Sequence, residues 1–310
     1  YYKENAKINF YKSIILLMEK INFKHSLIFF NFCILISPFY LLLNFEPIIL
    51  CLFIILLLGI SHGALDDIKG KKILKRLGYR SIILFYITYI LISIFIIIFW
   101  LMFPNIVLFL FLVVAAYHFG KEDTVFPYKK KFLMSECLFF LKGSSVIVAP
   151  LLLQKNATNE IFIILNFNVF ESAVFSNQFL TLMLCLSFLS SLYISSKKNT
   201  NLKGIMVMDF SSIIILNFFL TPLLAFTFYF CFLHSIRHSI TLIFELDKSF
   251  KIGLKKFIRK AIPLTFVTGI MFLFAVYFLN NFYKIDEAIY KVIFIGLASL
   301  TFPHILLEYL

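Results

Sequence analysis

The stretch Thr221-Pro-Leu-Leu-Ala-Phe-Thr-Phe-Tyr-Phe-Cys-Phe-Leu-His234-Ser-Ile-Arg-His238 joins an apolar run to two histidines that are four residues apart. It lies within residues 205–244, which carry few charges and are long enough to cross a membrane twice. Proline disfavours helical geometry in the residue before it, so we expect a turn at Thr221-Pro222 and a helix over 221–244. On a helix this spacing places both imidazoles on one face, where they would form half of a metal site.

The composition of the whole chain indicates a membrane protein. Of its 310 residues, 61% are hydrophobic, and the mean hydropathy is +0.95. Soluble domains contain only about 45–50% apolar residues. In hydrocarbon, helices can pair their backbone polar groups internally. The sequence therefore predicts an all-α, polytopic transmembrane helical bundle of about ten helices.

Apolar runs close to the spanning length of about 17–25 residues define the predicted helices. They cover residues 26–44, 47–65, 81–103, 105–120, 132–153, 177–196, 205–220, 221–244, 261–281 and 288–307. The shorter apolar segment 161–170 is predicted to be re-entrant or interfacial. Residues 1–25 form a basic amphipathic arm that is suited to an anionic membrane surface. Residues 26–310 form a single transmembrane helical domain, which is the predicted catalytic domain.

The formal net charge of +13 could indicate a nucleic-acid partner, but topology accounts for it. With ten passes, 25 of the 29 basic residues lie on the side of the N-terminal arm and three on the other, while Lys142 lies inside a helix. Basic residues are enriched on the cytoplasmic side, so we expect the arm and the N-terminus to be cytoplasmic. The expected partner is the lipid bilayer, and no nucleic acid is needed. The five cysteines show no C-x-x-C spacing, which argues against a zinc knuckle.

Five of the six histidines lie toward the C-terminal ends of even-numbered predicted helices, which run in the same direction. They are His62, His118, His234, His238 and His304. Histidine is tolerated at membrane interfaces because it is amphipathic. The shared depth of five of them nevertheless favours a common site in the cytoplasmic half of the membrane. The sixth, His25, lies at the end of the basic arm and is predicted to be a surface residue.

Carboxylates follow two of these histidines by four residues. Asp66 follows His62 and Glu122 follows His118, and each acid is followed at once by a second one, Asp67 or Asp123. If the helix continues, such an acid can accept the N–H of the far imidazole nitrogen and fix the tautomer of a metal ligand. The alternative is that these four acids are solvated loop residues.

Three further polar residues lie close to the histidines or inside a predicted helix. Tyr117 and Arg237 each precede a histidine, and either shape the pocket or anchor the helix ends at the interface. Lys142 is a buried charge and therefore a functional candidate, unless it forms a structural pair, for example with Glu136 or Asp209.

The histidines predict a metal without naming it. Imidazole-rich sites suit zinc, copper, iron or nickel. Four neutral imidazoles leave a divalent ion with its full charge, so Fe(II) there could bind O2 and meet a lipid-soluble substrate. Zinc hydrolysis also fits the ligands, but the sequence offers no general base beyond the same acids.

Four motifs in this order resemble the Brp/Blh family of β-carotene 15,15′-dioxygenases. They are H-G-A-L-D-D at 62–67, Y-H-F-G-x-E-D at 117–123, F-x-H-S-x-R-H at 232–238 and P-H at 303–304, and the resemblance spans roughly residues 45–310. It implies a membrane-embedded non-haem Fe(II) enzyme that cleaves the central double bond of β-carotene with O2 into two all-trans-retinal. The resemblance further implies a place in the cell (inner) membrane and, often, a functional link to a microbial rhodopsin.

The resemblance also implies roles for individual residues. The iron ligands and catalytic residues would be His62, His118, His234 and His238, with His304 a nearby fifth histidine. The basic arm matches no part of the family pattern.

Two other functions fit parts of the sequence. A membrane di-iron desaturase or hydroxylase also displays an H-x-x-x-H pair, but such enzymes use more histidines than the six of this chain. A non-catalytic retinal- or metal-binding membrane protein would have a similar composition. Metal analysis combined with a test for O2 dependence separates the three.

Overall fold

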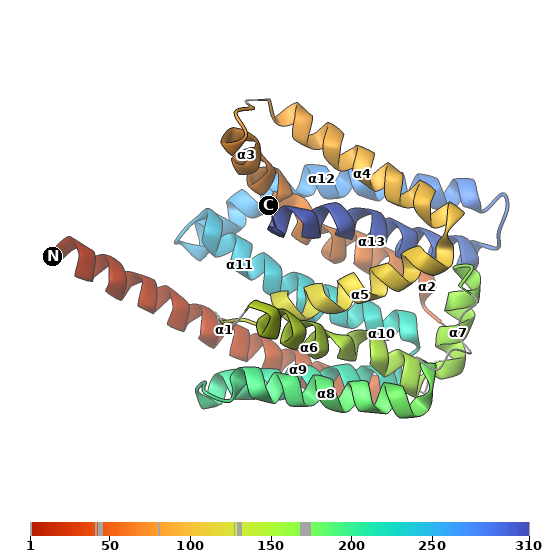
Figure 1. Cartoon of the computed structure of the whole chain (residues 1–310), viewed down its shortest axis with the longest axis horizontal. Coiled ribbons are helices and arrows are strands. Elements are labelled where there is room, and N and C mark those ends of the chain that lie inside the picture. The colour runs from red at the N-terminus through yellow and green to blue at the C-terminus, as the bar shows by residue number, and fades with distance from the viewer. Residues whose placement is uncertain are drawn as a thin grey trace.

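The computed structural model is a helical bundle, as the composition predicts (Figure 1). It describes residues 2–40, 42, 46–79, 81–126, 128, 132–167 and 175–309, without the side chains of 2–15, 62, 64, 308 and 309. All regular structure in this part of the chain is helical. Among the described residues, eight helices are long and apolar enough to cross a membrane, which confirms the polytopic all-α prediction.

The elements follow one another with short connections. In chain order they are α1 (Tyr2–Tyr40), α2 (Ile48–Ile54), the π-helix η1 (Ile55–Gly59), the 3-10 helix η2 (Ile60–Leu65), α3 (Asp66–Arg76), α4 (Ile82–Met102), α5 (Pro104–Glu122), α6 (Phe132–Leu153), α7 (Lys155–Ile164), α8 (Asn177–Ser195), α9 (Thr200–Phe219), α10 (Pro222–Phe228), the π-helix η4 (Tyr229–Ser235), α11 (Ile236–Leu246), α12 (Phe250–Leu279) and α13 (Ile285–Tyr309).

Two of the ten predicted passes consist of short pieces instead of one regular helix. The predicted helix 47–65 is divided into α2, η1 and η2, and the predicted helix 221–244 into α10, η4 and α11. The backbone is extended at Leu220 and Thr221, so α9 and α10 meet at the expected turn. Single π-helical turns often occur at functional sites. Both irregular passes carry histidines, at His62 in η2 and His234 in η4.

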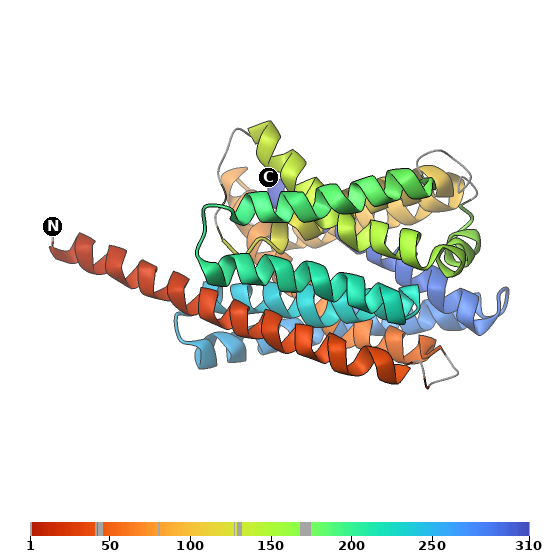
Figure 2. The same cartoon turned by 90° about the horizontal axis from the view of Figure 1, so that it is seen from below.

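The N-terminal segment and the first predicted pass form one continuous helix, α1. Figures 1 and 2 show its N-terminal part projecting beyond the bundle, while its C-terminal part packs alongside α9. Within the residues whose side chains are described, the part of α1 that is long and apolar enough to cross a membrane is Leu16–Tyr40. The helix therefore passes through residue 25, the predicted boundary of the arm, without interruption.

Helices α5 and α6 approach each other closely at two glycines. A side chain on Gly120 would collide with the Phe139 carbonyl, and one on Gly143 would collide with the Ala116 carbonyl. Small residues allow such close contact between membrane helices. This contact fixes the end of α5, where Glu122 and Asp123 follow His118.

The helix ends divide between the two ends of the bundle. In Figure 1 the C-terminal ends of α5 and α13 and the helix α11 lie at the end from which the N-terminus projects, and α7 runs across the opposite end. The segment predicted to be re-entrant, 161–170, includes the last part of α7, and its residues 168–170 lie outside the described part of the chain. The polar residues of the first end form the candidate site.

Candidate metal centre

Four buried imidazoles from three parts of the chain lie next to one another. His118 is on α5, His234 and His238 are on the η4–α11 segment, and His304 is on α13. The distances between ring centroids are 5.1 Å for His118–His234, 5.3 Å for His118–His304, 6.0 Å for His238–His304 and 6.5 Å for His234–His238. Each of the four rings therefore lies next to two of the others. The most deeply buried is His234, which is 0% exposed.

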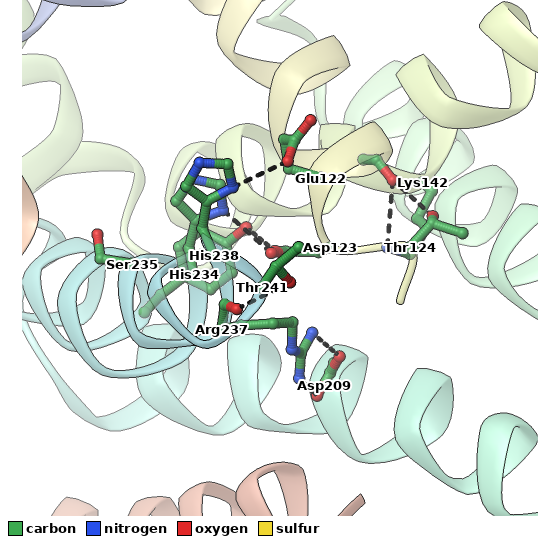
Figure 3. Close-up of polar contacts among 12 residues, drawn as sticks. Glu122, Asp123, Thr124, Lys142, Asp209, His234, Ser235, Arg237, His238 and Thr241 are labelled. Atoms are coloured by element: carbon green, nitrogen blue, oxygen red, sulfur yellow. Dashed lines mark hydrogen bonds and ion pairs between the residues drawn. The ribbon is translucent and has the colours of Figure 1, made fainter. Parts of the chain in front are cut away.

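The spacing of His234 and His238 produces the arrangement expected from the sequence. Their rings are stacked with an interplanar angle of 11° and come from consecutive helical turns. The backbone changes from π-helix to α-helix between them, at Ser235 and Ile236. Both rings consequently project to the same side, as Figure 3 shows.

Three of the four imidazoles bind a carboxylate through Nδ1. His234 Nδ1 lies 3.0 Å from Asp123 Oδ1, His238 Nδ1 lies 3.0 Å from Glu122 Oε2, and His304 Nδ1 lies 2.8 Å from Asp66 Oδ1. An ionised carboxylate only accepts hydrogen bonds, so each Nδ1 carries the proton and donates it. The lone pair of the neutral ring is then on Nε2, and such carboxylate support raises the basicity of a metal ligand.

The acids support histidines of other helices. The sequence paired Glu122 with His118 and Asp66 with His62, four residues earlier in each case. In the structure Glu122 and Asp123 at the end of α5 reach His238 and His234, and Asp66 at the start of α3 reaches His304. Asp66 directly follows η2, and Glu122 and Asp123 lie at the C-terminal end of α5, where the η4–α11 segment and α13 come close. Carboxylate–imidazole hydrogen bonds are thus present, but with partners other than those that the sequence spacing suggested.

His62 lies on η2, which leads directly into Asp66. Its side chain is outside the described part of the structure, so its role as a ligand stays a prediction. Among the side chains that are described, no group of three or more His, Cys, Asp or Glu is arranged so that it could hold a metal ion as it stands. A metal site is indicated by the presence of several imidazoles, by their proximity to one another and by their hydrogen bonds to acids.

Two tyrosines hold the supporting acids in place. Tyr229 donates its hydroxyl hydrogen to Asp123 Oδ2 at 2.6 Å, and the Tyr89 hydroxyl lies 3.1 Å from both Asp66 Oδ2 and the Leu300 carbonyl oxygen. Neither tyrosine could be identified from the sequence, because a tyrosine in an apolar run resembles an ordinary interfacial residue. The sequence feature that could have pointed to them is a hydroxyl group deep within a predicted apolar helix.

Arg237 is buried beneath the imidazoles and is not an interfacial anchor. Its guanidinium donates to both oxygens of Asp209, at 2.6 and 3.0 Å (Figure 3). It also donates to Ser26 Oγ at 2.7 Å. Ser26 in turn donates to Asp209 at 2.8 Å. This bidentate pair joins α1, α9 and α11 below the site. The hydroxyl of the other flanking residue, Tyr117, donates to Glu136 and joins α5 to α6.

Asp67 lies away from the imidazoles. It accepts from Lys260 Nζ at 3.3 Å and is partly exposed, as the alternative of a solvated acid requires. Lys142 is buried, and its Nζ donates to the Gly120 carbonyl at 3.3 Å. The two acids proposed as its partners bind elsewhere, Glu136 to Tyr117 and Asp209 to Arg237.

His25 does not lie where the sequence predicts. It was expected to be a surface residue, but it is partly buried, and its Nε2 lies 2.8 Å from the Phe232 carbonyl oxygen. The reason is that α1 packs against η4. The ring thus contacts the backbone of the turn that carries His234 instead of joining the other imidazoles.

Aromatic rings cover the inner side of the site. The Phe119 ring centroid lies 4.9 Å from that of His234, and Phe230 stacks on His234 at 5.9 Å with an interplanar angle of 16°. The imidazoles are thereby shielded from water on the side that faces the bundle core. Imidazoles of this kind suit zinc, copper, iron and nickel, so the donor set fits a first-row transition metal.

The chain is similar to proteins of one family. A family model described as "Beta-carotene 15,15'-dioxygenase" matches residues 53–310, which include all four imidazoles and their supporting acids. A protein of an uncultured marine bacterium (66A03), named "Beta-carotene 15,15'-dioxygenase", is 29% identical over 258 residues, which cover 82% of this chain and 90% of that protein. No solved structure matches the chain.

Proposed function

Because the chain belongs to the beta-carotene 15,15'-dioxygenase family and is a carotenoid-cleaving dioxygenase, we propose that it is an iron-dependent membrane enzyme that cleaves the central 15,15′ double bond of β-carotene with O2. One carbon–carbon double bond breaks, and each of its carbons gains one oxygen atom from the same O2 molecule. The two products are identical molecules of all-trans-retinal. No further reductant or oxidant is required.

The observation that carries the proposal is the set of imidazoles supported by carboxylates. His118, His234 and His238 would hold iron through Nε2, together with His62, whose motif matches the family. His304 has the same kind of support as His234 and His238, so we include it among the candidate ligands. Bound Fe(II) would supply the reactivity with O2 that a hydrocarbon and amino-acid side chains lack.

The residues of the chain prepare the site in three ways. Glu122, Asp123 and Asp66 orient the rings and keep the proton on Nδ1, so that Nε2 stays available. Phe119 and Phe230 restrict the access of water from the core side. The surrounding helices let a hydrocarbon reach the site from the bilayer without entering water.

The location of the site within the bundle supports a proposed orientation. Basic residues dominate the loops on the side of the N-terminus, which supports an orientation with that side and the imidazoles toward the cytoplasm, in the cell (inner) membrane. Retinal released there stays in the bilayer because it is apolar. A retinal-binding membrane protein, such as a microbial rhodopsin, could take it up directly.

The test combines metal analysis with turnover of the purified protein in detergent. We expect one iron per chain and two retinal molecules for each β-carotene, with each aldehyde labelled when the reaction is run under ¹⁸O2. Removal of iron by a chelator should stop product formation, and addition of Fe(II) should restore it. Two irons per chain would favour the desaturase or hydroxylase, and bound carotenoid without product would favour the carrier.

A further inference from the structure

An apolar cavity adjoins the imidazoles within the core of the bundle. Its volume is ≈ 70 Å³, and side chains of α5, α6, α7, α9, α10 and α13 surround it. Most of its wall is aliphatic or aromatic, with Phe111, Val146, Ile147, Ala225 and Phe294 among the lining residues. A space of this size holds several waters where polar partners are present.

The cavity is separated from the imidazoles by two aromatic side chains and extends away from them. Phe119 and Tyr229 line the cavity, and their ring centroids lie 4.9 and 6.4 Å from that of His234. On α5 the wall continues from Phe119 back to Phe111, which corresponds to about 12 Å along the helix axis at 1.5 Å per residue. An apolar molecule in the cavity would therefore have one end against the two rings that contact His234 and its body between the helices.

The polar side chains in the wall use their donors within the protein. Thr158 Oγ1 donates to the Pro150 carbonyl at 2.9 Å, Asn217 Nδ2 donates to the Ile213 carbonyl at 2.9 Å, and the Tyr229 hydroxyl donates to Asp123. The wall therefore offers water few hydrogen bonds, and apolar cavities of this kind stay dry and take apolar ligands. A space left vacant would also weaken the packing of the core.

We propose that this cavity binds one of the two hydrocarbon arms of the carotenoid and thereby places the central double bond beside the imidazoles. The inference rests on the proposed function and adds the residues that set the position of the substrate. An arm without polar groups matches a wall that is mainly apolar. The arm is larger than the cavity, so the stacked rings of Phe226 and Phe294 in its wall must give way as it enters.

Substitution of Ala225 tests the proposal because its methyl group lines the cavity. Ala225→Leu would fill the space that the arm occupies, and Ala225→Val would fill part of it. Ala225 precedes His234 by nine residues, about 13 Å along a helix, so the imidazoles should be unaffected. Ala275→Leu on α12 is the matched control, since it adds the same atoms outside the cavity wall.

Trp100 provides a direct measure of binding. It is the only tryptophan of the chain, and its ring centroid lies 6.3 Å from that of Phe111 in the cavity wall. A bound polyene should quench its fluorescence in a saturable way. The titration is done with β-carotene under anaerobic conditions, so that binding is measured without turnover.

We expect Ala225→Leu to raise the KM for β-carotene and the midpoint of Trp100 quenching by about tenfold or more, with Ala225→Val between it and the wild type. Iron content should not change, and Ala275→Leu should resemble the wild type. If Ala225→Leu does not fold, Ala225→Val is the test, and a smaller rise in its KM and in its quenching midpoint would support the proposal. Wild-type KM and quenching in a folded Ala225 variant would overturn the proposal. Failure of the wild-type protein to cleave bound β-carotene would instead overturn the proposed function.

Discussion

Asp66 binds the imidazole of His304, 238 residues further along the chain, with both carboxylate oxygens within 2.9 Å of Nδ1. This contact joins the start of α3 to the last helix of the chain. Both residues are buried, so the contact both holds the bundle together and orients a candidate metal ligand.

The first prediction concerns this carboxylate. Asp66→Asn should lower iron affinity and activity by roughly 10–100-fold, because the amide supports Nδ1–H of His304 less well. The measurement is an iron titration of the purified apoprotein. Asp67→Asn serves as the control, because Asp67 faces Lys260 near the surface and should change little. Equal iron affinity in the Asp66 variant and the wild type would show that the contact is structural only.

The second prediction concerns the buried pair below the site. Arg237→Met should lower the free energy of unfolding by about 3–5 kcal/mol, because the Asp209 carboxylate would be left buried without its cation. The double variant Arg237→Met/Asp209→Leu should recover much of that loss. Thermal or denaturant unfolding in detergent measures both. A double variant less stable than the single one would contradict this explanation.

The apolar runs and the turn at Thr221-Pro222 could be predicted because helix length and proline geometry are local properties. The partners of the acids could not, because they depend on how helices pack. Sequence spacing connects Glu122 with His118, whereas the bundle brings His238 to the end of α5. The same holds for Arg237 and Asp209, which lie on different helices.

The roles of Tyr229 and His25 could not be predicted for a related reason. A hydroxyl in an apolar run carries no local sign of its partner, and Asp123 is 106 residues from Tyr229. His25 follows a basic segment, which suggested the surface, but the packing of α1 turns its ring toward Phe232. The residue types therefore indicated the kind of site, whereas only the tertiary contacts show which residues are hydrogen-bonded to each other.

The third prediction concerns orientation. A green fluorescent protein fused after Lys248, between α11 and α12, should fluoresce, because that loop lies on the side with most of the basic residues. Alkaline phosphatase fused after Asn281, between α12 and α13, should be active outside the cytoplasm. In the control fusions the two reporters are exchanged between these positions, and neither should then be active. The reverse pattern of activity would place the imidazoles toward the outside.

The last prediction returns to His234 and His238. If one iron binds both, either His→Ala variant should lose retinal production and most bound iron, but remain inserted in the membrane, because apolar helices drive insertion. One alanine inserted between them should be equally damaging, since it rotates the second ring by about 100° around the helix. The same insertion between Lys248 and Ser249, in the loop after α11, should preserve activity. Retinal production at the wild-type rate by the first insertion variant would mean that the stacked rings do not share a metal.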